Sequence, residues 1–248
     1  PLSALPVGCR MPFIRMYMVK SHVDRPLRDS GVLPDYVFPV QAGAACCDVR
    51  VADLADNTGE HISDRNGNYC ELTALYWMWK NKMDTGGCAD GEEGQYYGLC
   101  QYRRAFEFGE DDLLRLLDND VDVVLPYPLP YEPDIHAHHE RYIKEADWQA
   151  LLQALSELQP AYAAAFPEIL GQRYLYNYNV ILAKKSVLRD YCAWLFPILM
   201  RTEELSVPKG SERNDRYLGY MGETLETLYF MKNAERLNVV HGECRLRT

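Results

Sequence analysis

Two adjacent arginines stand out in an otherwise acidic sequence. Arg103 and Arg104 end the turn Gln101–Arg104, which directly follows Tyr96–Cys100 (YYGLC), an apolar segment typical of a buried strand. The planar guanidinium group of arginine matches phosphate oxygens in bidentate geometry, and a departing diphosphate needs such charge compensation or a divalent metal ion. We therefore expect at least one of the two arginines to contact a diphosphate, with a structural ion pair as the alternative.

Glu223 is the candidate for acid–base chemistry. It lies early in a helix expected at Tyr217–Lys232, close to Gly219 and Gly222. Small residues allow a ligand or another backbone segment to approach closely. A carboxylate at this position could take a proton from an acceptor hydroxyl. The alternative is structural: the negative charge would stabilise the first turn of the helix.

Metal ligands are less clearly indicated. His136, His138 and His139 form a cluster (HAHH) that could bind a metal ion, contact a substrate or begin a solvated helix. No carboxylate stands nearby at a recognised metal-binding spacing. The DxD motif at Asp118–Asp120 precedes the strand expected at Val121–Leu125 instead of following one, which favours a solvated turn. A Mn²⁺ or Mg²⁺ cofactor therefore stays open, without a properly placed DxD to hold it.

The composition argues against several classes of protein. A net charge of −10 does not suit a general nucleic-acid binder. There is no apolar run near the roughly 18 residues of a membrane span, and no signal peptide is visible. The eight cysteines contain no CxxC pair, which argues against structural zinc and is typical of free thiols in a reducing cytoplasm. Nucleophile elbows, Walker loops and GxGxxG motifs, which would indicate a simple hydrolase, an NTPase or a dinucleotide oxidoreductase, are absent.

The 18 tyrosines suit sugar and base contacts, although an aromatic-rich core would explain them equally well.

Strands alternate with helices along the chain, a pattern typical of a mainly parallel sheet with helices on its faces. The expected strands are Phe13–Val19, Tyr36–Val40, Tyr96–Cys100, Val121–Leu125 and Tyr174–Leu182. The expected helices follow Asn68, span Leu113–Leu117, fill most of 135–170 with breaks at Pro160 and Pro167, run from Ser186 towards Met200 with a kink at Pro197, and span Tyr217–Lys232. Residues 1–12 are expected to be a loose arm. Residues 13–248 are expected to be a single α/β domain, and the start at Pro1 suggests that it was cut from a longer protein.

Polar segments are expected where ligands bind. In sheets of this kind ligands lie beyond the carboxyl ends of the strands, and the loop at 53–68 and the turn Gln101–Arg104 are candidates for that edge. Asn68, followed three residues later by Glu71, predicts the N-terminal cap of the next helix. Residues 84–94 form a second polar loop.

From about Met16 to Asn233 the sequence resembles a bacterial family first catalogued as a domain of unknown function in polysaccharide gene clusters. The resemblance rests on six blocks in matching order and spacing: PVQAGA (39–44), DNTGEHISDRNGNYCELTALYWMWKN (56–81), YYGLCQYRRAF (96–106), DVVLP (122–126), YLYNYNVILAKKSVLRDYCAWLF (174–196) and LGYMGETL (218–225). Members of the family are placed among glycosyltransferases of capsule, exopolysaccharide and O-antigen synthesis. Some are galactofuranosyltransferases, including one half of bifunctional O-antigen galactosyltransferases.

The resemblance implies a GT-A-type, Rossmann-like fold and assigns residues to its sites. It places nucleotide or donor contacts at Gln41, Gly43, Asp56, Asn57, Asn68, Glu71, Lys80, Tyr102, Arg103 and Arg104. It places donor or acceptor sugar contacts at Asn177 and Asn179, and a catalytic base at Glu223. His138 and His139 are expected sugar contacts from the histidine cluster alone. The sequence departs from the family at Gln101, where the family has histidine in a basic HYRR-like motif. This departure puts in doubt any metal or phosphate role for position 101.

The resulting hypothesis is an inverting glycosyl transfer from a UDP-sugar, best UDP-galactofuranose, to a hydroxyl of a growing surface polysaccharide. Glu223 would act as the base, and Arg103 and Arg104 would stabilise the departing diphosphate. The acceptor is expected to be lipid-linked, and the chain to act in the cytoplasm, at the inner face of the membrane by peripheral association. Two alternatives stay open: a retaining transferase of the same fold, and a non-catalytic carbohydrate-binding or scaffolding domain.

Overall fold

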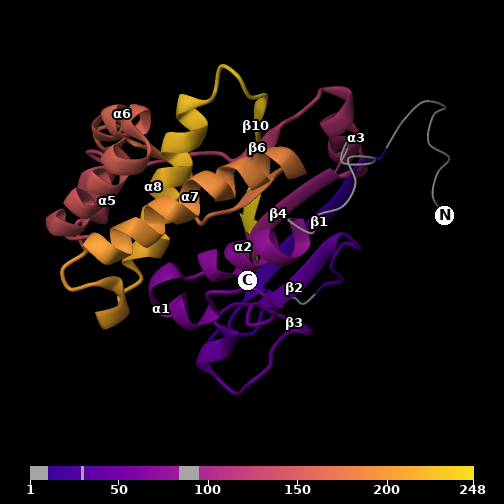
Figure 1. Cartoon of the computed structure of the whole chain (residues 1–248). Helices are drawn as coiled ribbons and strands as arrows, with labels where there is room; N and C mark the ends of the chain where they lie inside the picture. Colours follow the sequence, from indigo (N-terminus) through magenta and orange to yellow (C-terminus); the bar gives the residue numbers. More distant parts are fainter. Residues whose placement is uncertain (1–10, 29–30, 84–94) are drawn as a thin grey trace.

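Nine strands of the described residues form one mixed sheet, around which the helices pack (Figure 1). This computed structural model describes residues 11–28, 31–83 and 95–248. Most of the expected arm at 1–12 and the whole expected loop at 84–94 therefore lie outside the described residues.

The main path of the sheet has the order β10-β6-β9-β4-β1-β2-β3. Its strands are β1 (Phe13–Lys20), β2 (Val37–Gln41), β3 (Leu54–Ala55), β4 (Gln95–Gln101), β6 (Val123–Pro126), β9 (Ile181–Lys184) and β10 (Val239–Gly242). β1 pairs in parallel with β2 and β4, β2 with β3, and β6 with β10. β9 is antiparallel to both β4 and β6, so the other strands of this path all point the same way. The predicted α/β fold with a mainly parallel sheet is confirmed.

Four shorter strands of the described residues lie outside the main path of the sheet. β5 (Arg104–Phe106) pairs antiparallel with the end of β4 and with β11 (Cys244–Leu246), which brings the carboxyl-terminal segment across the turn that carries the arginines. β7 (Leu129–Pro130) and β8 (Tyr174–Leu175) form a separate two-stranded sheet.

The helices cover both faces of the sheet. They are α1 (Asn66–Tyr69), α2 (Leu72–Met78), α3 (Glu110–Asp118), α4 (Ile135–His139), α5 (Glu145–Leu158), α6 (Pro160–Leu170), α7 (Lys185–Leu205) and α8 (Tyr217–Lys232), and a π-helical turn at Trp79–Met83 extends α2. The strand β1 alternates between two cores, because successive side chains of a strand point to opposite faces. Tyr17 lies in the larger core with α2, α5, α7 and α8, whereas Met16 and Met18 lie in the smaller core with Leu113 and Leu116 of α3.

The prediction of one strand over Tyr174–Leu182 is wrong. Tyr178 and Asn179 have left-handed φ angles of 69° and 54°, which a continuous strand does not allow, and they separate β8 from β9. Since Ile181 pairs with Leu99 near the end of β4, the interrupted segment lies at the carboxyl edge of the sheet. The break therefore places polar side chains at that edge.

The prediction that Asn68 caps a helix is also wrong. Asn68 lies inside α1, and Cys70, with φ 51°, separates α1 from α2. The side-chain nitrogen of Asn68 donates to the carbonyl oxygens of Gly210 (2.6 Å) and Arg213 (2.8 Å). Its side-chain oxygen accepts from the backbone N–H of Asp215 (3.2 Å). Asn68 thus ties α1 to the loop that precedes α8.

Other helix boundaries follow the prolines only in part. The predicted break at Pro160 is confirmed, because α6 begins there. The predicted break at Pro167 is wrong, since Pro167 lies inside α6, and α7 continues through Pro197. The helix expected from Ser186 begins one residue earlier, at Lys185, without a side-chain cap. α8 spans Tyr217–Lys232 as predicted.

A buried ion pair holds the loop that leads into α8. The guanidinium of Arg213 donates to both carboxylate oxygens of Asp147 on α5, at 2.8 and 2.7 Å, and the two side chains are 6% and 0% exposed. Arg213 also lies 3.8 Å from the ring centre of Tyr217, the first residue of α8. This contact sets where α8 begins relative to the rest of the domain.

Asp147→Ala is expected to lower the free energy of unfolding by about 3 kcal/mol, because the buried guanidinium of Arg213 would lose its bidentate partner. Urea denaturation measures the loss. Glu157→Ala is the matched control, since it removes the exposed partner of Arg201 from the same helix and should change stability far less. Equal losses in the two variants would contradict a stabilising role for the Arg213–Asp147 pair.

Candidate active site

Four segments that are distant in sequence meet at the carboxyl end of β4. They contribute Glu71 from the junction of α1 and α2, Gln101 from the end of β4, Asn179 from the segment between β8 and β9, and Glu223 from α8. In open α/β sheets this edge is the usual place for ligands. We therefore take it as the candidate active site.

The carboxylate of Glu71 is held by two side-chain amides. Its Oε1 accepts from Asn179 Nδ2 (2.8 Å) and from Gln101 Nε2 (3.3 Å). Gln101 also donates to the carbonyl oxygen of Tyr178 (2.8 Å). Burial raises the pKa of Glu71, and the hydrogen bond from Asn179 lowers it. Gln101, the residue that departs from the family pattern, therefore positions Glu71 and the Tyr178 backbone.

Glu223 lies beside Glu71 and has a strongly perturbed carboxyl group. Burial raises its pKa to about 8, and the negative charge of Glu71 contributes to the rise. A hydrogen bond from the Tyr178 backbone and the positive charge of Arg104 act in the opposite direction. A group with this pKa exchanges a proton near the pH at which proteins work, which suits an acid–base catalyst.

The two predicted arginines point to different neighbours. The guanidinium carbon of Arg104 lies 3.8 Å from the ring centre of Tyr178. Its positive charge lies close enough to Glu223 to lower the pKa of that carboxyl group. No carboxylate of the described residues lies within ion-pair distance of Arg104. Arg103 instead donates through Nε to the hydroxyl of Tyr102 (2.7 Å), which itself donates to the carbonyl oxygen of Arg25 (2.8 Å). The structure therefore brings Arg104, but not Arg103, to the carboxyl pair.

Arg216 is a cationic residue that the sequence interpretation missed. It occupies the N-cap position of α8 with φ 65°, and its backbone N–H donates to the carbonyl oxygen of Gly67 (3.1 Å). Its side chain is exposed, and its charge lowers the pKa of Glu71. A single arginine in a polar NDR stretch carries no motif, so only the fold reveals that it lies near the site.

The glycines beside Glu223 serve helix packing. A Cβ atom on Gly219 would lie 2.9 Å from Cys70 Sγ. One on Gly222 would lie 2.6 Å from Leu72 Cδ1 and 3.0 Å from Asn179 Oδ1. Of the two expectations for these small residues, close approach of another protein segment is the one that the structure realises. This approach brings Glu223 next to Glu71.

Three of the residues expected to contact the nucleotide order the loop after β2. The carboxylate of Asp56 accepts from the backbone N–H groups of Gly43 (2.9 Å) and Ala44 (3.1 Å) and from the hydroxyls of Ser63 and Thr73 (2.6 Å each). The side chain of Gln41 is used in the same way: its nitrogen donates to the carbonyl oxygen of Val49 (2.8 Å), and its oxygen accepts from the N–H of Val51 (3.0 Å). Gly43 has φ 66°, a conformation that glycine adopts without strain. Gln41, Gly43 and Asp56 therefore shape the loop that would face a nucleotide.

The other expected donor contacts are placed apart from the carboxyl pair. Asn57 follows β3, is half-buried and has no side-chain hydrogen bond with the described residues, so its amide is available to a ligand. Lys80 forms an ion pair with Glu60 (3.9 Å) and lies 4.0 Å from the ring centre of Trp79. The amide of Asn68 is occupied by the loop before α8, as described above.

Of the residues expected to contact sugars, Asn177 and His138 lie with Tyr131 along one wall of the candidate site, whereas His139 is buried in the core. Asn177 Nδ2 donates to the hydroxyl of Tyr131 (2.8 Å), whose ring stacks on His138 with the ring centres 3.7 Å apart. The charge of Glu223 contributes to the raised pKa of Tyr131, so this wall borders the carboxyl pair. His139 is buried at 1% exposure, and burial lowers its pKa to about 4, which makes it a neutral core histidine.

No metal-binding cluster forms among the residues that the structure describes. No group of three His, Cys, Asp or Glu side chains in 11–28, 31–83 and 95–248 could hold a metal ion. The DxD residues lie in the exposed end of α3 and the turn after it, and Asp120 forms an ion pair with Lys184. This placement confirms the predicted turn. The same described residues contain no helix long and apolar enough to cross a bilayer.

Comparison with known proteins assigns the chain to a family. The family model described as "Domain of unknown function (DUF4422)" matches residues 18–234. The chain belongs to this family. Curated proteins give no match. Among solved structures, the chain resembles the apo structure of the bifunctional glycosyltransferase WbbM at 24% sequence identity and a TM-score of 0.76. The match covers 95% of this chain and 45% of the WbbM chain, so the chain spans less than half of that protein. At this identity, the fold is what the two share.

This DUF4422 domain carries a third carboxyl group deeper along α8. Glu226 is 1% exposed, and neither of its carboxyl oxygens has a hydrogen-bond partner among the described residues. Burial raises its pKa well above the ordinary value, and the negative charges of Glu223 and Glu71 add to the rise. Burial beside two other carboxyl groups therefore favours the protonated form of Glu226 in the folded domain.

The stability of the DUF4422 domain is expected to fall as pH rises. The folded state keeps protons on Glu223 and Glu226 at pH values where the unfolded chain, with a glutamate pKa of about 4.3, has lost them. The stabilisation is complete below that value and is lost as pH rises towards the folded pKa values, about 8 for Glu223. Thermal melts from about pH 5 to about pH 9 measure the slope, which Glu226→Gln should make shallower.

Glu204→Gln, on the surface of α7, is the matched control for this measurement and should keep the wild-type slope. A Glu226→Gln variant whose melting temperature falls with pH as steeply as that of the wild type would contradict a protonated Glu226 in the folded state.

Proposed function

We propose that this DUF4422 chain is a glycosyltransferase domain. It moves a sugar from a nucleotide-sugar donor, for which UDP-galactofuranose is our best assignment, to a hydroxyl of a bacterial surface polysaccharide. The observation that carries the proposal is Arg104, a half-buried cation that forms no ion pair with the described residues. It is placed beside the carboxyl pair Glu71–Glu223 at the carboxyl edge of the sheet. The likeness of the fold to WbbM supports it.

The donor diphosphate binds next to Arg104. Arginine without a carboxylate partner is available to phosphate oxygens, and stacking on Tyr178 holds its plane. Arg216, whose exposed side chain lies close enough to Glu71 to lower its pKa, supplies a second positive charge. Asn57 and the loop ordered by Asp56 face the nucleotide.

Glu223 acts as the base of an inverting transfer. Its carboxylate takes the proton from the acceptor hydroxyl, and the oxygen attacks the anomeric carbon of the donor. The bond between that carbon and the diphosphate oxygen breaks, and the electron pair leaves with the diphosphate, whose charge Arg104 stabilises. Holding both substrates in register supplies a large part of the acceleration.

The two other hypotheses account for less of the site. A retaining transferase needs no base, and the raised pKa of Glu223 would then have no part in the reaction. A carbohydrate-binding or scaffolding domain needs no diphosphate contact, and Arg104 would remain a half-buried cation without a function. The lipid-linked acceptor and the cytoplasmic location belong to the proposal as expected from the sequence, which left a divalent metal cofactor open.

Glu223→Gln is expected to abolish transfer while leaving UDP affinity within about twofold of wild type, because the amide keeps the shape but accepts no proton. In the wild type, the rate should rise about tenfold per pH unit up to a midpoint near pH 8, as the carboxyl group ionises. Sugar transfer measured as a function of pH checks both outcomes. A Glu223→Gln variant that transfers sugar at the wild-type rate would show that another group is the base.

Arg104→Ala is expected to weaken UDP binding by about tenfold or more, since a charge-assisted hydrogen bond contributes roughly 1.5–3 kcal/mol. Arg103→Ala is the neighbouring control and should weaken it less, because its side chain is held by Tyr102. Calorimetric titration with UDP compares the two variants. Wild-type affinity in a folded Arg104→Ala variant would remove Arg104 from the donor site.

A further inference from the structure

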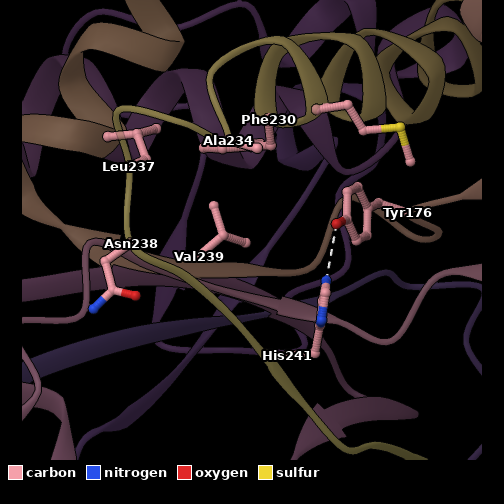
Figure 2. Close-up of a pocket in the computed structure, with 8 residues that line it drawn as sticks. Tyr176, Phe230, Ala234, Leu237, Asn238, Val239 and His241 are labelled. Carbon is pink, nitrogen blue, oxygen red and sulfur yellow. Dashed lines mark hydrogen bonds between the residues drawn. The ribbon is translucent and has the colours of Figure 1, made fainter.

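A pocket lies along α8, beyond the carboxyl pair. It has a volume of about 460 Å³ and lies between the carboxyl end of α8, the segment that follows it and the edge strand β10 (Figure 2). Tyr176 and His241 form one side, and Phe230, Met231, Asn238 and Val239 are among the residues that complete it. Ligand pockets of small molecules commonly have volumes of this order.

Hydrogen bonds connect this pocket to the candidate active site. The backbone N–H of Tyr176 donates to Thr227 Oγ1 (3.0 Å), and the Thr227 hydroxyl donates to the carbonyl oxygen of Glu223 (2.9 Å). Tyr176 also lies two residues before Tyr178, which contacts both Arg104 and Glu223. Thus the segment between β8 and β9 runs along α8 from the carboxyl pair to the pocket.

The spacing along α8 sets how far the pocket lies from the reacting centre. Glu223, Thr227 and Met231 follow one another at intervals of four residues, so they lie on the same side of the helix. Eight residues of helix span about 12 Å. A ligand in the pocket is therefore too far from Glu223 to be the group that reacts, yet close enough to belong to the same extended molecule.

None of the described residues that line the pocket has an acidic side chain, and none is a lysine or an arginine. Partial burial lowers the pKa of His241, so the imidazole is neutral at pH 7. Its Nε2 shares a hydrogen bond with the Tyr176 hydroxyl (2.9 Å), as Figure 2 shows. A nucleotide or another phosphate compound would find no cation here, which favours a neutral ligand.

Two rings of the lining, those of Tyr176 and His241, provide faces against which a sugar ring packs. Their centres are 5.7 Å apart and their planes are inclined by 29°. The exposed ring of Tyr127, which is not part of the lining, has its centre 5.5 Å from that of His241. At the rim, Asn238 is fixed because its side-chain nitrogen donates to the carbonyl oxygen of Asn119 (2.7 Å). Its side-chain oxygen has no partner among the described residues and is available to a hydroxyl.

We propose that this pocket binds a neutral sugar unit of the acceptor glycan, behind the unit whose hydroxyl reacts at Glu223. The proposal rests on the proposed function and adds to it a site that recognises the acceptor chain. Apolar lining and rings bind the faces of the sugar, and Asn238 accepts from its hydroxyls.

The test uses the ε-methyl resonance of Met231 in the full chain labelled with ¹³C-methyl methionine. Addition of a neutral galactose disaccharide is expected to shift this resonance and to leave that of Met83, in the core near α2, unchanged. Met231→Leu assigns the signal. His241→Ala should weaken disaccharide binding by about tenfold, because it removes one ring of the lining and the hydrogen bond that holds the Tyr176 hydroxyl. His136→Ala removes a histidine from α4 and should bind like wild type.

The outcomes separate this inference from the proposed function. If UDP binds but the disaccharide leaves Met231 unchanged, the acceptor pocket is wrong and the donor site stands. If the disaccharide shifts Met231 and His241→Ala weakens the binding that causes the shift, the pocket is a sugar site whether or not UDP binds. A shift that His241→Ala leaves at wild-type affinity would contradict a sugar bound against His241. A shift with a short isoprenoid alcohol but none with the disaccharide would overturn the proposal in favour of a lipid.

Discussion

The hydrogen bond from Asn179 to Glu71, 2.8 Å long, joins the two halves of the candidate site. Asn179 comes from the break between β8 and β9, and Glu71 from the junction of α1 and α2. Asn179 also donates to the carbonyl oxygen of Gly219 on α8 (3.3 Å), so one amide connects three segments. The left-handed φ of Asn179 is what turns the side chain towards Glu71, since the extended backbone of a strand would direct it elsewhere.

Burying several carboxyl groups together destabilises their charged forms. The domain nevertheless buries three of them, Glu71, Glu223 and Glu226, at or next to the candidate site. Glu71 is partly compensated by amides, Glu223 by a backbone N–H and Arg104, and Glu226 has no hydrogen-bond partner among the described residues. Such local conflict with stability is expected where a group must change its protonation state during function. The surrounding anchors, namely Asp56 in the loop after β2 and the Arg213–Asp147 pair before α8, hold the segments that carry these groups.

The alternation of strands and helices in the sequence was enough to predict a mainly parallel sheet with helices on both of its faces, and to predict the last helix. Burial dictates these patterns, because apolar side chains must recur on the side of each element that faces the core. Local rules failed where side chains serve distant partners. Asn68 looks like a cap in sequence but bonds to the loop at 210–215, and the break at Tyr178 has no glycine to announce it. The hydrogen bonds of Asn68 with Gly210 and of Asn179 with Glu71 join residues that are more than a hundred positions apart in the sequence, so they leave no local signal.

Of the site residues expected from the sequence, Glu71, Arg104, Asn179 and Glu223 lie together at the candidate site, and their roles stay predictions. Residue type could not separate a ligand contact from a structural one: Gln41 and Asp56 bond inside the protein, whereas Arg104 has no carboxylate partner among the described residues. Arg216 and Tyr131 were missed, since a lone arginine and one of 18 tyrosines are not distinguishable until the chain is folded.

The central claim is that the carboxyl edge beside Glu223 binds the donor diphosphate. A crystal structure of the chain with UDP tests it most directly. Our account predicts phosphate oxygens within hydrogen-bond distance of the Arg104 guanidinium, with the β-phosphate facing Glu223. A nucleotide bound elsewhere on the domain, with Arg104 still stacked on Tyr178 and free of phosphate, would contradict it.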